Sequence, residues 1–301
     1  MRRMAFIGSA FGYGAQNYST SLGPKYIKVG YDLVKKLKDL FIESYWYDIL
    51  ETKEINLNFI PNTGKNYKAV LQHSHKLNLS IKQFLTNTNS DFPVIIGGDH
   101  SCAIGLWSGI IDTLNANKKY GLIWIDAHMD AHTLDTSPSK AYHGMPLSFL
   151  LGYNTENFQL SQVQVSPNNL VIIGARSFEE EEKILNLLRV RIFYIDEVRK
   201  RGLKTVFEEA VSIVNRNTKS FGVSLDLDSI DPNDAPGVGS PVQNGLSWLE
   251  LKNNLPIVFS NPNFSALEIA EFNPKLDVEN KTAEIIFQVV GILGGCLFSP
   301  C

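Results

Sequence analysis

One stretch of the chain places carboxylates and an imidazole at a spacing that suits metal binding. Asp126-Ala-His128-Met-Asp130 directly follows the apolar run 120–125, which we predict to be a buried strand. Residues two apart in an extended segment point to the same face, so Asp126, His128 and Asp130 are expected to project together. Carboxylates gathered at the end of a buried strand repel one another and are poorly solvated unless a cation lies among them. The stretch therefore predicts a metal site.

Three other predicted strands also end in carboxylates or histidine. In open parallel sheets, ligands bind beyond the carboxyl ends of the strands, so the residues that follow each strand are the candidates. Those positions hold three further segments: Gly97-Gly-Asp-His100-Ser, Asp226-Leu-Asp228-Ser-Ile-Asp231-Pro and Glu271-Phe-Asn-Pro274. We interpret His100, Asp226 and Asp228 as additional metal ligands.

Other polar residues have simpler interpretations. Asp99 is expected to hydrogen-bond its own loop, and Asp231, which precedes a proline, is expected to form a turn. His73 and His75 are two apart on a predicted helix and face different directions, which favours surface positions for both. The acidic run 179–182 is typical of a solvated helix start, where the helix dipole favours negative charge.

The charges of the candidate ligands indicate how many ions they could hold. Four aspartates carry four negative charges and two neutral histidines add none, which balances two divalent cations. Carboxylate and imidazole ligands without thiolate favour a hard ion such as Mn²⁺ over a structural Zn²⁺. Two cations about 3.5–4 Å apart can share a water and lower its pKa towards neutrality. A shared hydroxide leaves the cluster slightly negative, which suits a cationic substrate.

The elements that must position these residues alternate between strands and helices. Strands are predicted at 4–8, 44–50, 93–97, 120–125, 169–173, 190–194, 221–225 and 266–270. Helices are predicted at 24–40, 66–85, 101–115, 179–188, 205–215, 247–259 and 281–293. This alternation predicts an α/β fold with a mostly parallel sheet and helices on both faces. No internal repeat, low-complexity segment or linker-like change of composition interrupts it, so we expect a single domain over residues 1–301.

Composition excludes several classes of protein. Hydrophobic residues make up 44% of the chain, charged residues 20%, and the net charge is −3. These values are ordinary for a globular protein, and no basic stripe indicates a nucleic-acid partner. No apolar run approaches the ~18–20 residues of a membrane span, so no membrane partner is expected. Three scattered cysteines, Cys102, Cys296 and Cys301, are too few for a disulfide framework or a thiolate zinc site and indicate a reducing compartment.

The N-terminus could imitate a signal peptide, because Arg2 and Arg3 precede the short apolar run 4–8. Glycines interrupt that run from residue 8 onwards, and polar residues follow soon after. This pattern favours a first strand that leaves the core through a glycine-rich loop. We therefore expect a cytoplasmic protein.

With these residues assembled, the chain resembles the arginase family of ureohydrolases. The resemblance spans nearly the whole chain and is carried by Gly23-Pro24, Gly97-Gly-Asp-His100-Ser, Asp126-Ala-His-Met-Asp130, His143-Gly-Met-Pro146, Ser224-Leu-Asp226-Leu-Asp228-Ser-Ile-Asp231-Pro232, Gly239-Ser-Pro241, Gly245-Leu-Ser247 and Ala266-Leu-Glu-Ile-Ala-Glu271-Phe-Asn-Pro274. It implies a three-layer α/β/α sandwich around a mostly parallel sheet, formed as one arginase-like catalytic domain. It also implies a homo-oligomer, either a trimer or a hexamer.

The resemblance implies two Mn²⁺ ions per subunit, with Co²⁺ or Ni²⁺ as substitutes. One ion would be bound by His100, Asp126, Asp130 and Asp226, and the other by His128, Asp126, Asp226 and Asp228, so that Asp126 and Asp226 bridge. A bridging hydroxide would attack the guanidinium carbon and release urea and an amine. Asp130 would orient the hydroxide, Glu271 would pair with the guanidinium, and His143 would be the proton shuttle.

The resemblance also bears on the substrate. The loop that contains Ser139 is similar to the arginase branch, where a serine reads the α-carboxylate of the amino acid. Glu179 and Glu182 occupy the places that in the family receive the α-ammonium, and Ser240 is expected to be a further substrate contact. Three positions depart from the family pattern: arginases usually carry asparagine in place of His132 and Ala141, and aspartate in place of Glu179. A histidine could still donate to the carboxylate, whereas Ala141 removes a polar contact.

The resulting hypothesis is a binuclear manganese hydrolase that converts L-arginine to L-ornithine and urea. The alternative within the family is an agmatinase or another ureohydrolase with a guanidino substrate, since agmatine lacks the carboxylate that Ser139 would read. A non-catalytic metal-binding or regulatory protein on the same fold would not need His143 and Glu271. A deacylase on the same architecture would not need the paired Asp-x-His-x-Asp and Asp-x-Asp segments.

Overall fold

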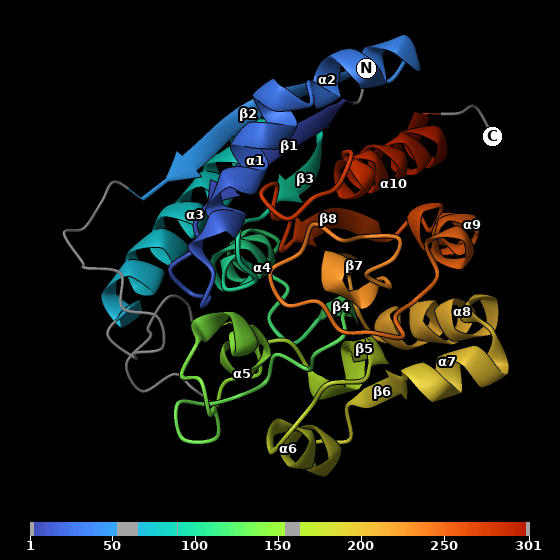
Figure 1. The fold of residues 1–301 in the computed structure, drawn as a ribbon. Coiled ribbons are helices and arrows are strands. Elements are labelled where there is room, and N and C mark those ends of the chain that lie inside the picture. The colour runs from blue at the N-terminus through green and yellow to red at the C-terminus, as the bar shows by residue number, and fades with distance from the viewer. Residues whose placement is uncertain (1–2, 53–65, 89, 154–162, 299–301) are drawn as a thin grey trace.

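The computed structural model describes residues 3–52, 66–88, 90–153 and 163–298, and a parallel β-sheet forms its centre (Figure 1). In spatial order its eight strands are β2 (Ser44–Glu51), β1 (Met4–Ala10), β3 (Phe92–Ile96), β8 (Phe264–Ala270), β7 (Ser220–Asp226), β4 (Tyr120–Ile125), β5 (Leu170–Ala175) and β6 (Arg191–Tyr194). All neighbouring strands pair in parallel, so their carboxyl ends meet at one edge. The predicted α/β fold is confirmed. Cys301 lies outside the described residues.

Helices cover both faces of the sheet, which makes three layers (Figure 1). One face packs against α2 (Leu33–Asp39), α7 (Ile195–Arg201), α8 (Leu203–Val214), α9 (Trp248–Phe259) and α10 (Lys281–Phe298). The other face packs against α3 (Tyr67–Asn87), α4 (Cys102–Thr113), α5 (Pro146–Leu150) and α6 (Glu181–Leu187).

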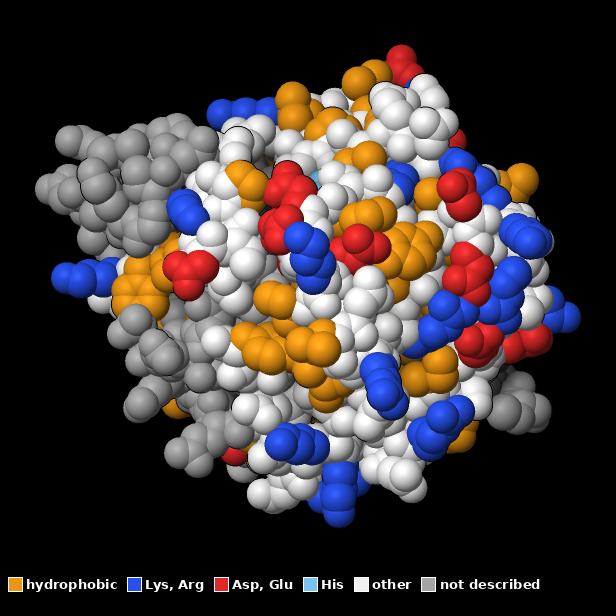
Figure 2. Space-filling model, turned by 90° about the horizontal axis from the view of Figure 1, so that it is seen from below, with side chains coloured by type: hydrophobic (Ala, Val, Ile, Leu, Met, Phe, Trp, Pro, Cys, Tyr) orange, Lys and Arg blue, Asp and Glu red, His pale blue; other side chains and the backbone are white. Residues whose placement is uncertain are grey.

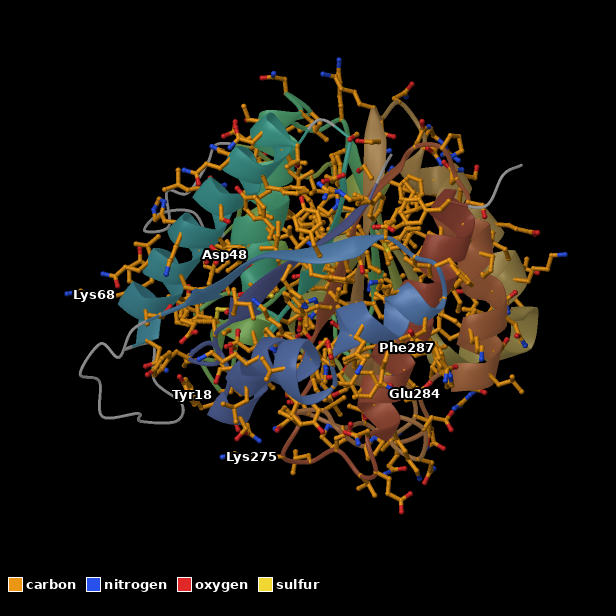
Figure 3. All side chains as sticks on the ribbon, turned by 90° about the horizontal axis from the view of Figure 1, so that it is seen from above. Tyr18, Asp48, Lys68, Lys275, Glu284 and Phe287 are labelled. Carbon is orange, nitrogen blue, oxygen red and sulfur yellow. The ribbon has the colours of Figure 1, made fainter. Side chains whose placement is uncertain are left out.

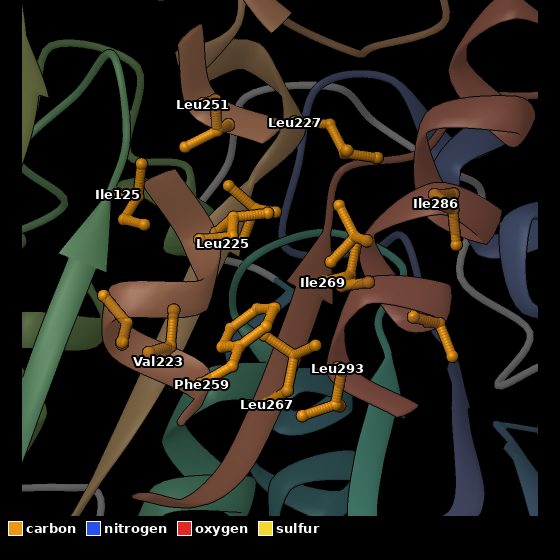
Figure 4. Close-up of a cluster of buried hydrophobic side chains, with 14 of the residues drawn as sticks. Ile125, Val223, Leu225, Leu227, Leu251, Phe259, Leu267, Ile269, Ile286 and Leu293 are labelled. Atoms are coloured by element: carbon orange, nitrogen blue, oxygen red, sulfur yellow. The ribbon is translucent and has the colours of Figure 1, made fainter. Parts of the chain in front are cut away.

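The alternation of side chains along each strand divides the core into two clusters. On β4, Ile123 and Ile125 belong to one cluster, while Leu122 and Trp124 belong to the other. Figure 4 shows part of the first cluster, in which strand residues such as Leu225 pack with residues of α9 and α10. Large aliphatic side chains contribute about 1.5–3 kcal/mol each when fully buried, so both clusters hold the strand ends firmly in register.

By length and composition, α10 could cross a membrane, because it has 18 residues with a mean hydropathy of 1.5. We predicted that no continuous apolar run approaches this length, and Lys281, Glu284 and Gln288 do interrupt the apolar residues of α10. In the structure, 44% of α10 is buried, and its inner face lies against the sheet core. Figure 3 shows Glu284 and Phe287 on the side of α10 that faces the N-terminal helices, where Tyr31 donates to Glu284 and its ring centroid lies 6.5 Å from that of Phe287. Here α10 is a core helix.

Two predicted helices differ from the structure. The segment 24–40 is interrupted: α1 (Gly23–Lys25) passes into a π-helical turn at Tyr26–Gly30, and the left-handed Asp32 (φ 53°) separates this turn from α2. The helix predicted at 205–215 begins earlier, at Leu203, and is preceded by α7. Acidic residues in the first turn of α7 and basic residues in its last turn match the helix dipole, and this was the overlooked pattern.

His73 is buried, whereas we predicted a surface position. It lies four residues after Ala69 and four before Leu77 on α3, within the buried stripe of that helix. Its Nε2 lies 2.7 Å from Ser9 Oγ and its Nδ1 lies 2.8 Å from Thr52 Oγ1, and burial lowers the pKa of His73 to about 3. The prediction for His75, which is exposed, is confirmed.

Lys and Arg side chains are interspersed with acidic and apolar side chains on the face that Figure 2 shows. Two of the arginines pair with acids: Arg191 and Arg201 both contact Glu197 and Glu209. This mixed surface agrees with the near-neutral composition of the chain.

Candidate metal centre and substrate cavity

The candidate ligands follow adjacent strands at the carboxyl edge of the sheet. In spatial order, β3 leads to His100, β8 to Glu271, β7 to Asp226 and Asp228, and β4 to the segment from Asp126 to Asp130. The strands are parallel neighbours, so residues far apart in the sequence meet at one place. The loop after β3 passes close to the loop after β1: a Cβ on Gly98 would lie 1.9 Å from Phe11 O, so only glycine fits.

The segment after β4 reaches the site by a route different from the one we predicted. The strand ends at Ile125, and Asp130 has a left-handed backbone with φ of 45°. The side chains therefore do not converge through strand alternation. Asp126 is instead fixed by Trp124 Nε1, which donates to its Oδ2 at 2.8 Å, and by the backbone N–H of His128, which donates to its Oδ1 at 2.7 Å.

Two groups of ligand atoms share Asp126. In the first group, His100 Nδ1 lies 2.9 Å from Asp226 Oδ2, 3.0 Å from Asp130 Oδ2 and 3.3 Å from Asp126 Oδ2. In the second, His128 Nδ1 lies 3.1 Å from Asp228 Oδ2 and 3.5 Å from Asp126 Oδ1. Within each of the sets His100–Asp126–Asp130 and Asp126–His128–Asp228, the ligand atoms lie within 4.8 Å of one another. The six predicted ligands are thus brought together.

These residues fit divalent cations by their chemistry. His100 Nδ1 is fully buried and, within the described part of the chain, makes no well-aligned hydrogen bond, although three carboxylates surround it. One imidazole nitrogen can donate only one proton, so it cannot satisfy three carboxylates. An oxygen-rich pocket with two imidazoles is a ligand set suited to Mn²⁺ and similar ions.

The pKa values of several groups in the site are shifted upward, which favours their protonated forms, as expected where negative charges lie close together. Burial and the neighbouring Asp228 and Asp126 raise the pKa of Asp226 well above its usual range. Burial and Asp126 raise the pKa of Asp130 to about 6. Burial lowers the pKa of His128, but Asp228 and Asp126 outweigh it and raise that pKa to about 12. Protons and metal ions therefore compete for this cluster.

A buried polar network lies behind His100. The Nε2 atom of His100 lies 2.8 Å from Ser224 Oγ, and Ser224 donates to Glu268 Oε2 at 2.7 Å. Glu268 is fully buried and also accepts from Trp107 Nε1 at 2.8 Å and from Cys102 Sγ at 3.2 Å. We assigned no role to Ser224 or Glu268 from the sequence. Their polar side chains inside apolar strands were the detectable pattern, because a buried polar group requires a partner.

A cavity of about 190 Å³ opens above the ligand groups. Its lining includes the metal-site residues His128, Asp130, Asp226 and Asp228. Around them lie His132, Pro138, Ser139, His143, Gly144, Ser177, Phe178, Glu179, Glu181 and Ser240. Four of the five predicted substrate contacts, His132, Ser139, Glu179 and Ser240, therefore lie in the cavity wall.

Glu182 is not among the cavity-lining residues, whereas its neighbour Glu181 is. The Tyr194 hydroxyl donates to Glu182 Oε1 at 2.5 Å, which directs Glu182 towards the end of β6. Glu181 is 2% exposed and its Oε2 lies 3.0 Å from His132 Nε2. Burial raises the pKa of Glu181, but the hydrogen bond to His132 outweighs it, and the net shift is downward. Successive residues of a helix point in different directions, so Glu181 lines the cavity and Glu182 does not, and the assignment of Glu182 as a substrate contact stays a prediction.

Glu271 and His143 form a pair at the side of the site. Glu271 Oε1 accepts from the backbone N–H of His100 at 2.8 Å and lies 3.2 Å from His143 Nδ1, while its buried Oε2 has no hydrogen-bond partner among the residues that the structure describes. Burial lowers the pKa of His143, but the hydrogen bond to Glu271 outweighs it and raises that pKa to about 9. His143 lines the cavity, whereas Glu271 lies behind it at 1% exposure.

Several polar residues hold the surrounding loops. Asp99 accepts from Gly14 N at 2.8 Å and Ser101 N at 3.0 Å, and Asp231 accepts from Asn233 N at 3.1 Å, so the structural interpretations of both aspartates are confirmed. Arg176 was not assigned a role. Its guanidinium donates to the backbone oxygens of Asp228 at 2.7 Å, Val242 at 2.8 Å and Ser229 at 3.1 Å, which ties the ligand loop to the segment beyond Ser240.

Comparison with known proteins agrees with this architecture. A model of the arginase family matches residues 2–293. The arginase of Bacillus subtilis (strain 168) is 34% identical over 300 residues, which cover 98% of each chain. The arginase of Bacillus caldovelox is 32% identical over 308 residues, covering 98% of this chain and 99% of that protein. The solved structure of the Bacillus caldovelox arginase matches with a TM-score of 0.88 and 31% identity, covering 98% of this chain and 99% of that one.

The parallel sheet and the His/Asp groups at its carboxyl edge define an α/β enzyme with metal-binding groups. The comparisons make the assignment more specific: the chain belongs to the arginase family and is an enzyme of the ureohydrolase type.

Proposed function

We propose that this protein is a binuclear manganese hydrolase that converts L-arginine to L-ornithine and urea. The observation that carries the proposal is that two His/Asp groups share Asp126 beneath a cavity whose wall holds Ser139, Glu179 and His143. The relatives that are named arginases support the choice of arginine. We further propose that residues 1–301 form a single catalytic domain, that the protein is cytoplasmic, and that it assembles as a trimer or hexamer.

The metal ligands would be His100, Asp126, Asp130 and Asp226 for one ion and His128, Asp126, Asp226 and Asp228 for the other. When bound, two such cations lower the pKa of a shared water, so that hydroxide is available near neutral pH. Two divalent cations would balance the four aspartates, so a shared hydroxide would leave the cluster slightly negative, which favours a cationic guanidinium in the cavity above it.

Three residues of the chain would act on the substrate. Asp130 would accept a hydrogen bond from the attacking hydroxide and orient it towards the guanidinium carbon. The buried Oε2 of Glu271 accepts no hydrogen bond from the residues that the structure describes, which suits it to the N–H groups of a guanidinium. His143 would donate a proton to the leaving amine as its bond to carbon breaks, and its contact with Glu271 keeps a proton available near neutral pH.

The other end of the substrate would meet the rim of the cavity. Glu179, whose side chain is 56% exposed, would attract the α-ammonium group. The hydroxyl of Ser139 would donate to the α-carboxylate, and Ser240 lies in the same wall. Because Ala141 provides no polar side chain there, carboxylate recognition would depend on fewer groups than an asparagine at this position would allow.

A panel of guanidino substrates tests the proposal. We expect kcat/KM to be higher for L-arginine than for agmatine when the protein is loaded with Mn²⁺, with Co²⁺ and Ni²⁺ compared in parallel. Higher kcat/KM for agmatine or for another guanidino compound would show that L-arginine is not the preferred substrate, while the proposed type of reaction would stand. Metal binding without turnover of any guanidino compound would reject the enzymatic proposal.

A further inference from the structure

Glu181 connects two loops at the rim of the cavity. It is the first residue of α6 and is 2% exposed, although it carries a carboxylate. Its Oε2 lies 3.0 Å from Nε2 of His132, which belongs to the loop after β4. Both of its oxygens also accept from the backbone N–H of Glu179, at 3.1 and 3.2 Å, in the loop after β5. Glu181 therefore fixes the position of two cavity-lining residues.

These contacts leave His132 without a free ring nitrogen. Its Nε2 faces Glu181, and its Nδ1 lies 3.2 Å from the hydroxyl of Thr136. The backbone of His132 is held as well, because its N–H donates to Gly144 O at 3.0 Å. An imidazole has two ring nitrogens and no other hydrogen-bonding atom, so a third partner could bind only by displacing one of these two.

We propose that Glu181 is a positioning residue for substrate selection: it withholds the hydrogen-bond donor of His132 from the carboxylate of an amino-acid substrate. Its own negative charge beside that position also disfavours a carboxylate. The protein then discriminates less between a guanidino amino acid and the corresponding amine than it would if Nε2 of His132 were free. This inference rests on the proposed function, because it assumes that the rim of the same cavity receives the amino-acid end of the substrate.

Glu181→Ala tests the inference through the ratio of kcat/KM for L-arginine to kcat/KM for agmatine. Removal of the carboxylate frees Nε2 of His132, so we expect this ratio to rise about tenfold, the size expected for one added hydrogen bond to a charged group. The rise should come from a lower KM for arginine with little change in kcat. The Glu181→Ala/His132→Ala double variant should return the ratio to about the wild-type value.

Two further variants separate this effect from a general loosening of the rim. In Glu181→Gln, the side-chain carbonyl oxygen can still accept from Nε2 of His132, so the ratio should change much less than in Glu181→Ala. Glu180→Gln is the matched control, because Glu180 is adjacent, its side chain is 62% exposed, and it pairs with Lys183. Loosening of the loops would lower kcat/KM for both substrates alike.

Binding of L-ornithine and of putrescine to the Mn²⁺-loaded protein, measured by calorimetry, gives a readout that needs no turnover. We expect Glu181→Ala to strengthen ornithine binding relative to putrescine binding by a similar factor. If arginine is not hydrolysed but this shift occurs, the proposed function fails and the inference stands. An unchanged or lower preference for the carboxylate-bearing ligand in Glu181→Ala overturns the inference.

Discussion

Ser224 on β7 and Glu268 on β8 are paired neighbours in the sheet, and the Ser224 hydroxyl donates to Glu268 Oε2 at 2.7 Å. The same hydroxyl oxygen lies 2.8 Å from His100 Nε2, so a fully buried carboxylate orients the ring whose Nδ1 faces the aspartates. Partners of this kind fix the ring orientation and tautomer of a metal-ligating histidine. The sheet register thus contributes directly to the geometry of the candidate metal centre.

Ser224→Ala should weaken metal binding by about 10-fold to 100-fold, the range typical for loss of such a partner. Titration with a competing chelator measures this change without any need for activity. Ser265→Ala is the matched control, because Ser265 is a serine of the neighbouring strand β8 whose hydroxyl bonds the Tyr120 hydroxyl, away from the ligands. An unchanged chelator midpoint in Ser224→Ala would show that the hydroxyl does not support His100.

Metal affinity should rise with pH, because metal binding displaces protons from the cluster. The pKa of His128 is raised to about 12, so in the metal-free site it holds a proton at neutral pH, and Asp130, with its pKa raised to about 6, takes up a proton as the pH falls towards 6. Each must be released before its ligand atom can bind. Calorimetric titration with Mn²⁺ at pH 6, 7 and 8, in buffers with different enthalpies of protonation, measures both affinity and proton release. Affinity that does not depend on pH, with no protons released, contradicts this description of the site.

Glu271→Gln should lower the pKa of His143 from about 9 towards its ordinary value of 6.5. The folded-state pKa of His143 is raised, so the pair stabilises the metal-free protein fully below pH 6.5 and loses this contribution as the pH rises through 9. Removal of the carboxylate charge should abolish that loss of stability. NMR titration of the His143 ring gives the pKa, and thermal unfolding between pH 6 and 9 gives the stability. A His143 pKa near 9 in Glu271→Gln would assign the shift to other groups.

Asp228→Ala should reduce the metal content from two ions per chain to about one. Asp228 belongs only to the second of the two ligand groups, in which its Oδ2 contacts His128. Asp126, in contrast, belongs to both groups. Metal analysis after dialysis measures the stoichiometry, and circular dichroism checks that the fold is intact. Asp231→Ala serves as the control, because Asp231 belongs to neither ligand group and accepts hydrogen bonds from the backbone N–H groups of Asn233 and Gly245. Two tightly held ions in Asp228→Ala would show that the ligand assignment is wrong.

The sequence was sufficient to predict the sheet and the convergence of the ligands. Strand–helix alternation implies a parallel sheet, and a parallel sheet brings residues such as His100 and Asp226 together because both lie at or just beyond the carboxyl end of a strand. These inferences needed only local patterns and one topological rule. They did not require knowledge of which strands are neighbours.

Features that depend on tertiary contacts could not be predicted in the same way. The left-handed backbone of Asp130 and the inward orientation of Glu181 depend on loops from other strands. The Ser224–Glu268 pair depends on β7 and β8 being neighbours in register. The burial of His73 was within reach, because its spacing from Ala69 and Leu77 matches the apolar face of α3.

Urea release from L-arginine, measured before and after metal removal on the same preparation, tests the central claim most directly. The account predicts that the Mn²⁺-loaded protein forms urea and L-ornithine in equal amounts, that chelation abolishes this activity, and that added Mn²⁺ restores it. No urea from arginine above the metal-free control, in a folded protein that holds two Mn²⁺ ions, would contradict it.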